Sequence, residues 1–173
     1  MTLRLPILIL TLFAILSFAP SCQTLHFYGQ AIHGQVEILH ESRSNQQVIA
    51  DSKTPPALKK QLLTVQKIRE FASDHLSLPG DSSYGKYANL GRKHVVWVLY
   101  AAPEFSLKPK SWHYPIIGEI SYRGYFREQD TIAFANQLRA QHYDVFVGGV
   151  DAYSTLGWFH DPILNTFVSY PDI

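Results

Sequence analysis

The stretch from His94 to Ala102, HVVWVLYAA, constrains the fold of this chain more than any other. Its side chains are apolar at both odd and even positions, and many are β-branched or aromatic. This pattern is typical of a strand that is buried on both faces. Pro103 follows and ends the strand, because proline has no N–H group to donate to a sheet. The sequence therefore predicts a buried central strand here.

Two helices are predicted before this strand. From Leu25 to Leu39, apolar residues recur every three or four positions, which indicates a helix. Gly29 and Gly34 weaken this helix by up to about 1 kcal/mol each relative to alanine, and they favour the close approach of a second helix. That helix is predicted to start at Thr54-Pro55-Pro56, with Thr54 as N-cap, and to end at Leu78-Pro79-Gly80. We expect the two helices to form an antiparallel hairpin.

The segments after the central strand predict more sheet and one further helix. Alternating apolar residues around Ile116 to Tyr122 predict a second strand, and Asp144 to Val150 a third. Between them, Arg127 to His142 has the helical period. This order of elements is typical of the α+β class. We expect an N-terminal helical hairpin followed by a small mixed or antiparallel sheet with a packed helix.

Residues 1–21 have the pattern of an export signal. A basic residue precedes an almost unbroken apolar run from Ile7 to Phe18, which is too short to cross a bilayer as a helix of about 20 residues. The run leads to Ala19-Pro20-Ser21-Cys22, an imperfect lipobox whose thiol can accept a diacylglycerol. The sequence predicts a lipoprotein signal at 1–21 and a domain at 22–173, anchored through Cys22 to a membrane of the bacterial cell envelope. A plain secretory signal or an uncleaved anchor is the alternative.

Charge and cysteine content narrow the possible partners. The chain has 15 basic and 14 acidic residues and no basic stripe interleaved with aromatics, so nucleic acid is not an expected partner. Cys22 is the only cysteine, so no disulfide can form within the chain. The stability of the domain must therefore come from its core.

Several motifs of hydrolytic enzymes are absent from the 173 residues. There is no HExxH zinc motif, and the closest string, His40 to Ser44, lacks the second histidine. There is no GxSxG motif, and Gly148-Gly149 lacks the rest of a phosphate loop. His26, His33 and His40 recur every seven residues along one helix face, whereas metal ligands on a helix are normally three or four residues apart. We expect these histidines to be solvated or partly buried rather than metal ligands.

Single polar residues could still contribute to a site. Glu104, after the central strand, could orient a ligand, and Arg123 could bind a carboxylate through two hydrogen bonds. The C-terminal stretch, which is dense in aromatics and glycines, adds three candidates: Asp151, His160 and Asp161. Each has an ordinary alternative as a capping or solvent-exposed carboxylate, a surface ion pair or a turn residue.

A bacterial family described as predicted aminopeptidases, zinc-dependent and often lipid-anchored, resembles this chain in three long strings. They are KHVVWVLYAAPEFSLKPKSWHYPIIGEI (93 to 120), SYRGYF (121 to 126) and YDVFVGGVDAYSTLGWFHDPILNTF (143 to 167). The resemblance extends back through LHFYGQAIHGQVEIL (25 to 39) and so covers essentially all of the mature chain. Chance matches to such aromatic-rich strings in the same order are improbable.

The resemblance implies metal-assisted hydrolysis of peptides at their N-terminus. In such enzymes zinc polarises the scissile carbonyl and activates water, and a glutamate moves protons. The family's HExxH helix follows the segment that matches LNTFVSYPDI, and this sequence ends at Ile173, before it. We therefore expect a zincin-like fold that is truncated at the C-terminus and inactive as given, with zinc required by the full-length family but bound by no motif here. The alternative is a non-catalytic exported lipoprotein binding module.

Two positions depart from the family pattern. Relatives often have cysteines where this chain has His113 and Glu119. A disulfide that is possible in those relatives is therefore lost here.

The resemblance also suggests where a peptide substrate would lie. In such folds an edge strand commonly binds an extended peptide through main-chain hydrogen bonds. Our candidate strand is Tyr153 to Phe159, where Gly157 would allow close backbone approach and Trp158 and Phe159 could line a side-chain pocket. The predicted substrate-lining residues are Tyr153, Gly157, Trp158 and Phe159, unless the aromatic rings belong to the core.

Overall fold

The computed structural model describes residues 22–78, 83–115 and 117–168 of the chain. The helices in these ranges are α2 (Cys22–Glu41), α3 (Asn45–Ala50), α4 (Pro56–Leu76), α5 (Glu128–Arg139) and α6 (Asn165–Val168). The strands are β1 (Ser42–Ser44), β2 (Lys86–Ala88), β3 (Val96–Pro103), β4 (Trp112–Tyr114), β5 (Gly118–Ile120), β6 (Arg123–Tyr125), β7 (Tyr143–Val150) and β8 (Ile163–Leu164). Helices combined with small mixed and antiparallel sheets confirm the α+β class.

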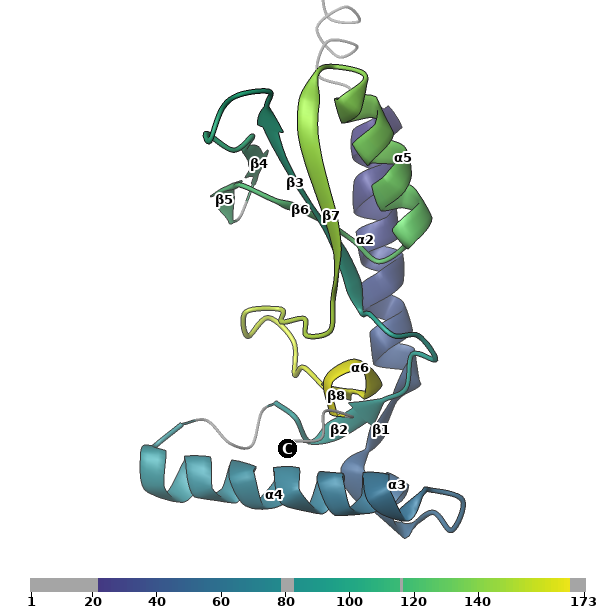
Figure 1. Cartoon of the computed structure of the whole chain (residues 1–173). Helices are drawn as coiled ribbons and strands as arrows, with labels where there is room; N and C mark the ends of the chain where they lie inside the picture. Colours follow the sequence, from purple (N-terminus) through teal and green to yellow (C-terminus); the bar gives the residue numbers. More distant parts are fainter. Residues whose placement is uncertain (1–21, 79–82, 116, 169–173) are drawn as a thin grey trace, which may run out of the picture.

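β3 is the middle strand of the sheet β6-β3-β7, as predicted for HVVWVLYAA. It is antiparallel to both neighbours, and its pair with β7 runs from Val96 opposite Val150 to Pro103 opposite Tyr143. β3 and β7 form the long ribbon in the upper part of Figure 1. The predicted strand at 144–150 and helix at 127–142 correspond to β7 and α5, so both predictions are confirmed.

One face of this sheet is covered by α5 and α2, which lie side by side (Figure 1). The Gln23 side chain of α2 donates a hydrogen bond to that of Gln137 of α5 at 2.7 Å, and His26 of α2 lies 3.5 Å from the carboxylate of Asp130 of α5. A buried cluster joins the two helices to the sheet: Phe27, Leu99, Ala101, Tyr125, Phe134, Ala135 and Leu138. The expected packed helix is therefore present.

The opposite face of the sheet is open over much of its length in the described part of the chain. Tyr100 and Phe146 are cross-strand partners there and are 43% and 65% exposed. The Tyr100 ring centroid lies 5.7 Å from that of Tyr122 and 6.4 Å from that of Phe146. The prediction that β3 is buried on both faces is therefore wrong at Tyr100. Only at the start of the strand, where Val96 is buried, is this face covered.

α2 confirms the first predicted helix but does not bury the residues whose spacing predicted it. Those five are all exposed: Leu25, Tyr28, Ile32, Val36 and Leu39. The buried face contains Phe27, Gln30, Gly34 and Ile38. A Cβ atom at Gly34 would collide with the ring of Phe126, so this glycine admits an aromatic ring rather than a second helix.

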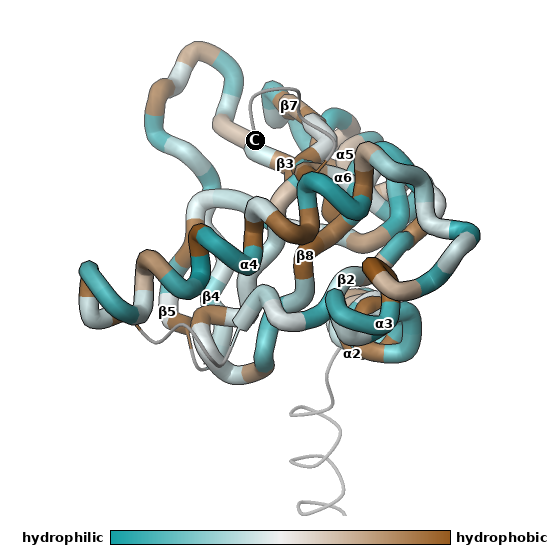
Figure 2. The backbone as a smooth tube through the Cα atoms, turned by 90° about the horizontal axis from the view of Figure 1, so that it is seen from below, coloured by the Kyte–Doolittle hydropathy of each residue, from teal (hydrophilic) through white to brown (hydrophobic). Residues whose placement is uncertain are grey.

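The far end of α2 leads into a second sheet, built from short strands. Its order is β1-β2-β8, with β1 antiparallel and β8 parallel to β2. α4 runs crosswise to α2 in Figure 1 and passes in front of β8 in Figure 2. A buried cluster joins α3, α4, α6 and this sheet: Val48, Leu62, Tyr87, Ile163 and Val168. Because the apolar partners of α4 are α3, α6 and the sheet β1-β2-β8, α2 and α4 do not form the expected hairpin.

α4 closely follows its predicted limits. It begins at Pro56 with Pro55 as N-cap, one residue after the predicted Thr54 cap. It ends at Leu76, where Ser77 takes a left-handed conformation with φ of 52°. The Pro79-Gly80 part of the predicted stop lies outside the described residues.

β4 and β5 form a separate antiparallel hairpin in which His113 lies directly opposite Glu119. The two positions at which the resemblance implies cysteines in relatives are therefore cross-strand neighbours. Such Cα pairs are about 4.5–5.5 Å apart, within the range that a disulfide needs. The strand predicted around Ile116 to Tyr122 is instead divided into β5 and β6, with a bend at Ser121 between them.

α2 begins at Cys22, the predicted lipidation site. The predicted signal at 1–21 lies outside the described residues. Among the helices that the structure describes, none is both long and apolar enough to span a membrane.

Candidate functional site

β7 is an edge strand in the described part of the chain, since β3 is its only strand partner there. Two hydrogen bonds distinguish the side of β7 that pairs with β3 from its free edge. The Val150 carbonyl accepts from the Val95 N–H at 2.9 Å, on the side of β3. The Val145 carbonyl accepts from the Arg139 guanidinium at 3.2 Å. Because main-chain groups alternate along a strand, even-numbered residues of β7 bond to β3 and odd-numbered residues face the free edge.

Two residues near the end of β7 present main-chain groups at this free edge. By the same alternation, Val147 and Gly149 direct their N–H and C=O groups away from β3. Gly149 also admits the His94 ring, with which a Cβ atom at this position would collide. A free edge of this kind is a template for an extended peptide, which can add to the sheet through main-chain hydrogen bonds.

His94 and Asp151 meet at the end of this edge. His94 precedes β3 and Asp151 follows β7, and the antiparallel register brings both to the same end of the sheet. The Nδ1 atom of His94 is hydrogen-bonded to an Asp151 carboxylate oxygen, and the two side chains are 19% and 22% exposed. The His94 ring also packs edge-on against Trp97, with 5.0 Å between ring centroids. A carboxylate on Nδ1 fixes the imidazole and leaves Nε2 to exchange a proton or contact a ligand.

In the part of the chain that the structure describes, His94 has no hydroxyl partner of the kind that a catalytic triad requires. Within the described residues, no serine or threonine hydroxyl is hydrogen-bonded to His94. The hydroxyls of Ser154 and Thr155 donate to Asp161 instead, at 3.1 and 2.7 Å. The His94–Asp151 pair can therefore orient a ligand or move a proton, but it does not activate a described nucleophile.

The predicted substrate strand from Tyr153 to Phe159 is a loop in the structure. The Asp161 carboxylate holds the loop by accepting hydrogen bonds from the N–H and hydroxyl of Thr155 at 2.9 and 2.7 Å. Leu156 and Gly157 have φ angles of 54° and 85°, which turn the backbone away from an extended course. The strand prediction is wrong because these local side-chain bonds compete with a sheet ladder.

The four predicted substrate-lining residues separate into two groups. Tyr153 packs edge-on against Phe126, with 5.3 Å between ring centroids, at the margin of the core. Trp158 and Phe159 project from the loop and are 69% and 48% exposed, next to the turn at Gly157. Their contact with a substrate stays a prediction.

A cavity of about 330 Å³ opens at the base of this loop. It is lined by Tyr84, Ala152, Tyr153, Ser154 and Phe167. Burial raises the pKa of Tyr153, and the Asp161 carboxylate raises it further, so the Tyr153 hydroxyl stays protonated near neutral pH. The cavity thus offers aromatic surface and hydroxyl groups to a ligand.

The other candidates from the sequence are not brought together. Glu104 and His160 are exposed, and Asp161 is occupied within its loop. The three helix histidines are exposed, as expected for a solvated face: His26, His33 and His40. Asp151 is paired with His94, which sequence reasoning missed. The sequence contained a signal for this pair. If the two predicted strands pair in antiparallel fashion, the residue before the first strand lies beside the residue after the second.

The described residues do not fit a zinc site. In the described ranges, no three histidine, cysteine, aspartate or glutamate side chains gather closely enough to hold a metal ion. The 173 residues also contain no HExxH motif. The His94–Asp151 pair alone supplies fewer ligands than a protein zinc site normally has.

The fold and the site define an α+β protein with a free edge strand that ends at a His–Asp pair. The chain belongs to the family described as "Putative aminopeptidase", whose family model matches residues 26–173. This match confirms the resemblance found in the sequence. No curated protein and no solved structure matches the chain significantly.

Proposed function

We propose that this chain takes part in the zinc-dependent removal of N-terminal residues from peptides, and that its described part holds the peptide along the free edge of β7. The family match over residues 26–173 supports peptide hydrolysis. The main support for the binding mode is the free edge itself, where Val147 and Gly149 direct main-chain groups outward. An extended peptide bound there gains regular hydrogen bonds without regard to its side chains.

His94 occupies a useful position in this proposal. Its ring lies against Gly149, one of the outward-facing residues, and Asp151 fixes its orientation. A peptide paired with Gly149 would therefore bring one of its ends or main-chain groups towards this imidazole. We assign His94 to contact with the bound peptide and Asp151 to the positioning of His94.

The zinc requirement, export and membrane anchor belong to the same proposal. The resemblance of the sequence to a family described as zinc-dependent supports the zinc requirement. The apolar run and lipobox support export to the bacterial cell envelope with Cys22 as the anchor. The loop residues Trp158 and Phe159 remain candidates for contact with peptide side chains.

The proposal is tested first on the purified 173-residue chain. We expect it to bind a fluorescent peptide with a free N-terminus but neither to retain stoichiometric zinc after dialysis nor to release the first residue. Stoichiometric zinc together with turnover would contradict the expectation that no motif in these 173 residues binds zinc. Translation of the nucleotides after codon 173 in every frame is an independent check, and absence of HExxH there would favour a non-catalytic binding module.

The binding mode has its own matched pair of variants. Val147→Pro removes an outward-facing N–H that β3 does not use, whereas Val147→Ala shortens the same side chain and keeps the N–H. We expect the proline variant to bind the peptide about fivefold to tenfold more weakly than the alanine variant, the loss of about one main-chain hydrogen bond. Equal affinities of the two variants would show that the peptide does not lie on this edge.

A further inference from the structure

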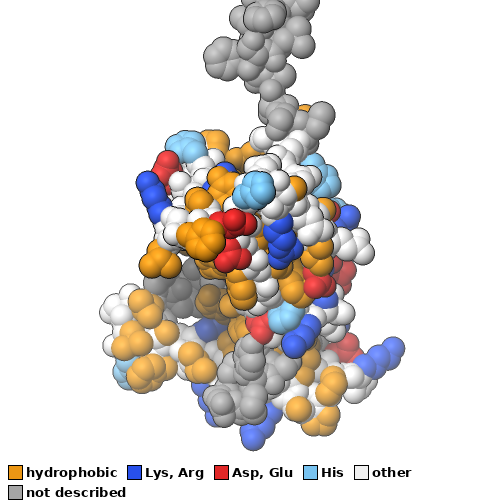
Figure 3. Space-filling model, turned by 45° about the horizontal axis from the view of Figure 1, so that its top comes forward, with side chains coloured by type: hydrophobic (Ala, Val, Ile, Leu, Met, Phe, Trp, Pro, Cys, Tyr) orange, Lys and Arg blue, Asp and Glu red, His pale blue; other side chains and the backbone are white. Residues whose placement is uncertain are grey.

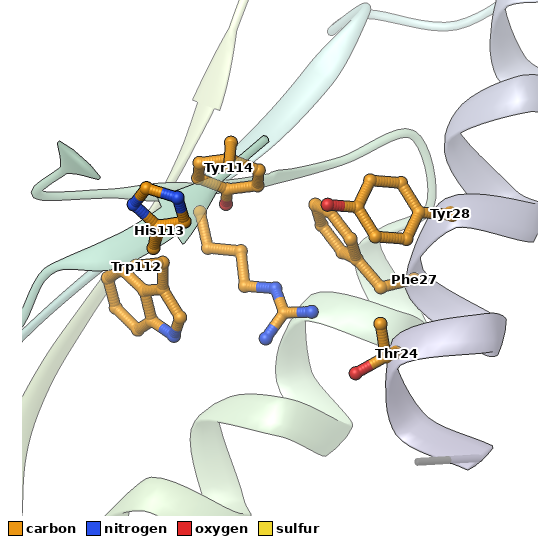
Figure 4. Close-up of a pocket in the computed structure, with 7 residues that line it drawn as sticks. Thr24, Phe27, Tyr28, Trp112, His113 and Tyr114 are labelled. Carbon is orange, nitrogen blue, oxygen red and sulfur yellow. The ribbon is translucent and has the colours of Figure 1, made fainter. Parts of the chain in front are cut away.

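A second cavity, of about 160 Å³, lies between α2 and β4. It is lined by Thr24, Phe27, Tyr28, Trp112, His113, Tyr114 and Arg123. Phe27 and Tyr28 approach it from α2, and Trp112 and Tyr114 face them from β4 (Figure 4). The walls are therefore mainly aromatic, and Arg123 supplies the one formal positive charge among the lining residues.

The Arg123 guanidinium is enclosed by aromatic rings. Its central carbon lies 3.9 Å from the centroid of Phe27, 4.8 Å from that of Phe134 and 5.8 Å from that of Tyr125. Rings at these distances stabilise the cation through the faces of the guanidinium plane. They do not accept its N–H groups in the way that an oxygen atom does.

No acidic side chain of the described residues neutralises Arg123. Its Nε atom is buried without a hydrogen-bond partner, and no described carboxylate lies within 4.0 Å of the guanidinium. Asp130, on the neighbouring helix α5, pairs with His26 instead. A buried and unpartnered donor on a charged group is costly, which is why such groups are normally paired.

The Tyr114 hydroxyl does not neutralise the positive charge of Arg123. Burial raises the pKa of Tyr114 to about 12, even though Arg123 acts in the opposite direction. The Tyr114 phenol is therefore neutral at physiological pH and can donate a hydrogen bond but cannot compensate the cation. The Thr24 and Tyr28 side chains also turn their oxygen atoms towards β4 (Figure 4).

We propose that this cavity binds a monocarboxylate whose body is apolar or aromatic, with the carboxylate paired to Arg123. The flat guanidinium fork matches a carboxylate through two parallel hydrogen bonds, and the aromatic walls match an apolar body. A volume of about 160 Å³ holds a body of about benzene size, and the rest of a larger ligand would lie at the open mouth of the cavity. A phosphate dianion fits less well, because Arg123 is the one lining residue that is cationic at neutral pH regardless of environment. An α-ammonium group fits less well too, since no lining side chain is acidic.

This site does not depend on peptide hydrolysis at β7. The carboxylate could come from a free organic acid or from the C-terminus of a peptide, and the ligand set distinguishes them. The probes are phenylacetate, N-acetyl-phenylalanine, N-acetyl-phenylalanine amide and phenyl phosphate. They are titrated into the full 173-residue chain in mild detergent, with calorimetry and ligand-observed NMR as readouts.

We expect both carboxylates to bind at least about tenfold more tightly than the amide, which has the body of N-acetyl-phenylalanine without the charge. Tighter binding of phenylacetate would assign a free acid, and tighter binding of N-acetyl-phenylalanine would assign a peptide C-terminus. Equal affinity for acid and amide, tighter binding of phenyl phosphate than of either acid, or no binding of any probe would overturn the proposal.

Variants then assign the binding to Arg123. We expect Arg123→Gln to weaken carboxylate binding about tenfold or more and Arg123→Lys to weaken it less, because lysine keeps the charge without the fork. Arg127→Gln, on an exposed arginine outside the cavity, removes the same charge and is expected to bind like the wild type. Unchanged affinity in Arg123→Gln would overturn the assignment. Should that variant fail to fold, the acid and amide comparison on the wild-type chain still decides the proposal.

Discussion

The two faces of the sheet β6-β3-β7 differ sharply although they share the same strands. On the covered face, Leu99 and Ala101 lie under α5 and α2 and are 0% and 3% exposed. On the open face, the neighbouring Tyr100 and its partner Phe146 are 43% and 65% exposed. Consecutive residues of one strand thus experience an interior and a solvent-exposed surface. Hydrophobicity in the sequence is similar on the two faces, so it does not tell them apart.

This difference shows that apolar residues in this chain not only form the core but also lie exposed on the surface. Exposed apolar side chains also occur along α2 and at the tip of the loop with Trp158 and Phe159. In Figure 3, hydrophobic side chains reach the visible surface in several patches between charged ones. The covered face determines stability, and the open face leaves aromatic surface beside the edge strand on which the proposed peptide lies.

The largest contrast is expected between substitutions of two adjacent residues. Leu99→Ala leaves a cavity in the covered face and is expected to lower the free energy of unfolding by about 3 kcal/mol. Tyr100→Ala removes more atoms, but they are largely solvated, and the expected loss is about 1 kcal/mol or less. Urea unfolding of the full chain followed by circular dichroism measures both. A larger loss for Tyr100→Ala would mean that the open face is packed in solution.

The sequence predicts this sheet better than it predicts the rest of the fold. β3, α5 and β7 are long enough for their own periodicity to define them, so their limits are nearly right. The sheet β1-β2-β8 consists of strands of two or three residues, which are defined by partners far away in the chain rather than by local pattern. Which side of α2 is buried also depends on a distant residue, Phe126. Its ring packs against Gly34, where a Cβ atom would collide with it.

The candidate site was less predictable for a related reason. The aromatic-rich stretch after β7 suggested a strand, but the bonds of Thr155 to Asp161 hold it as a loop. Arg123 was recognised as a possible carboxylate ligand, yet its aromatic surroundings come from three separate elements. His94 and Asp151 are far apart in sequence and adjacent only through the register of β3 and β7. Contacts of this kind require the topology to be known first.

A disulfide across the β4–β5 hairpin is expected to have the next largest effect. His113→Cys combined with Glu119→Cys places two thiols directly opposite each other, on a hairpin whose Trp112 and Tyr114 pack against the covered face. Closing such a short loop is expected to stabilise the folded state by about 2 kcal/mol under oxidising conditions. Unfolding midpoints with and without reductant measure the gain. The single variant Glu119→Cys serves as the control, and an absent gain would mean that the hairpin register differs in solution.

Alkaline pH is expected to weaken the covered face by a smaller amount. Burial raises the pKa of Tyr125 to about 12 from an ordinary value of 10.0. Between these values the unfolded chain loses the phenolic proton while the folded protein keeps it, so the free energy of unfolding falls as pH rises. The stabilisation by the protonated Tyr125 phenol is complete below about pH 10. We expect the free energy of unfolding to fall by about 1 kcal/mol by about pH 11. Urea unfolding across this range measures the slope, which Tyr125→Phe should reduce, and an identical slope in that variant would refute the assignment.

The smallest effect on stability is expected on the open face, at Phe146. Because its side chain is 65% exposed, Phe146→Ser is expected to change the free energy of unfolding by no more than about 0.5 kcal/mol. The same substitution removes part of the aromatic surface that Tyr100 and Tyr122 continue, so binding of a fluorescent hydrophobic probe should decrease. Ile132→Ser, at an exposed position of α5, is the matched control and should leave more of the probe signal. Equal losses in both variants would show that the probe responds to scattered apolar residues, and the contrast between the two faces would then rest on stability alone.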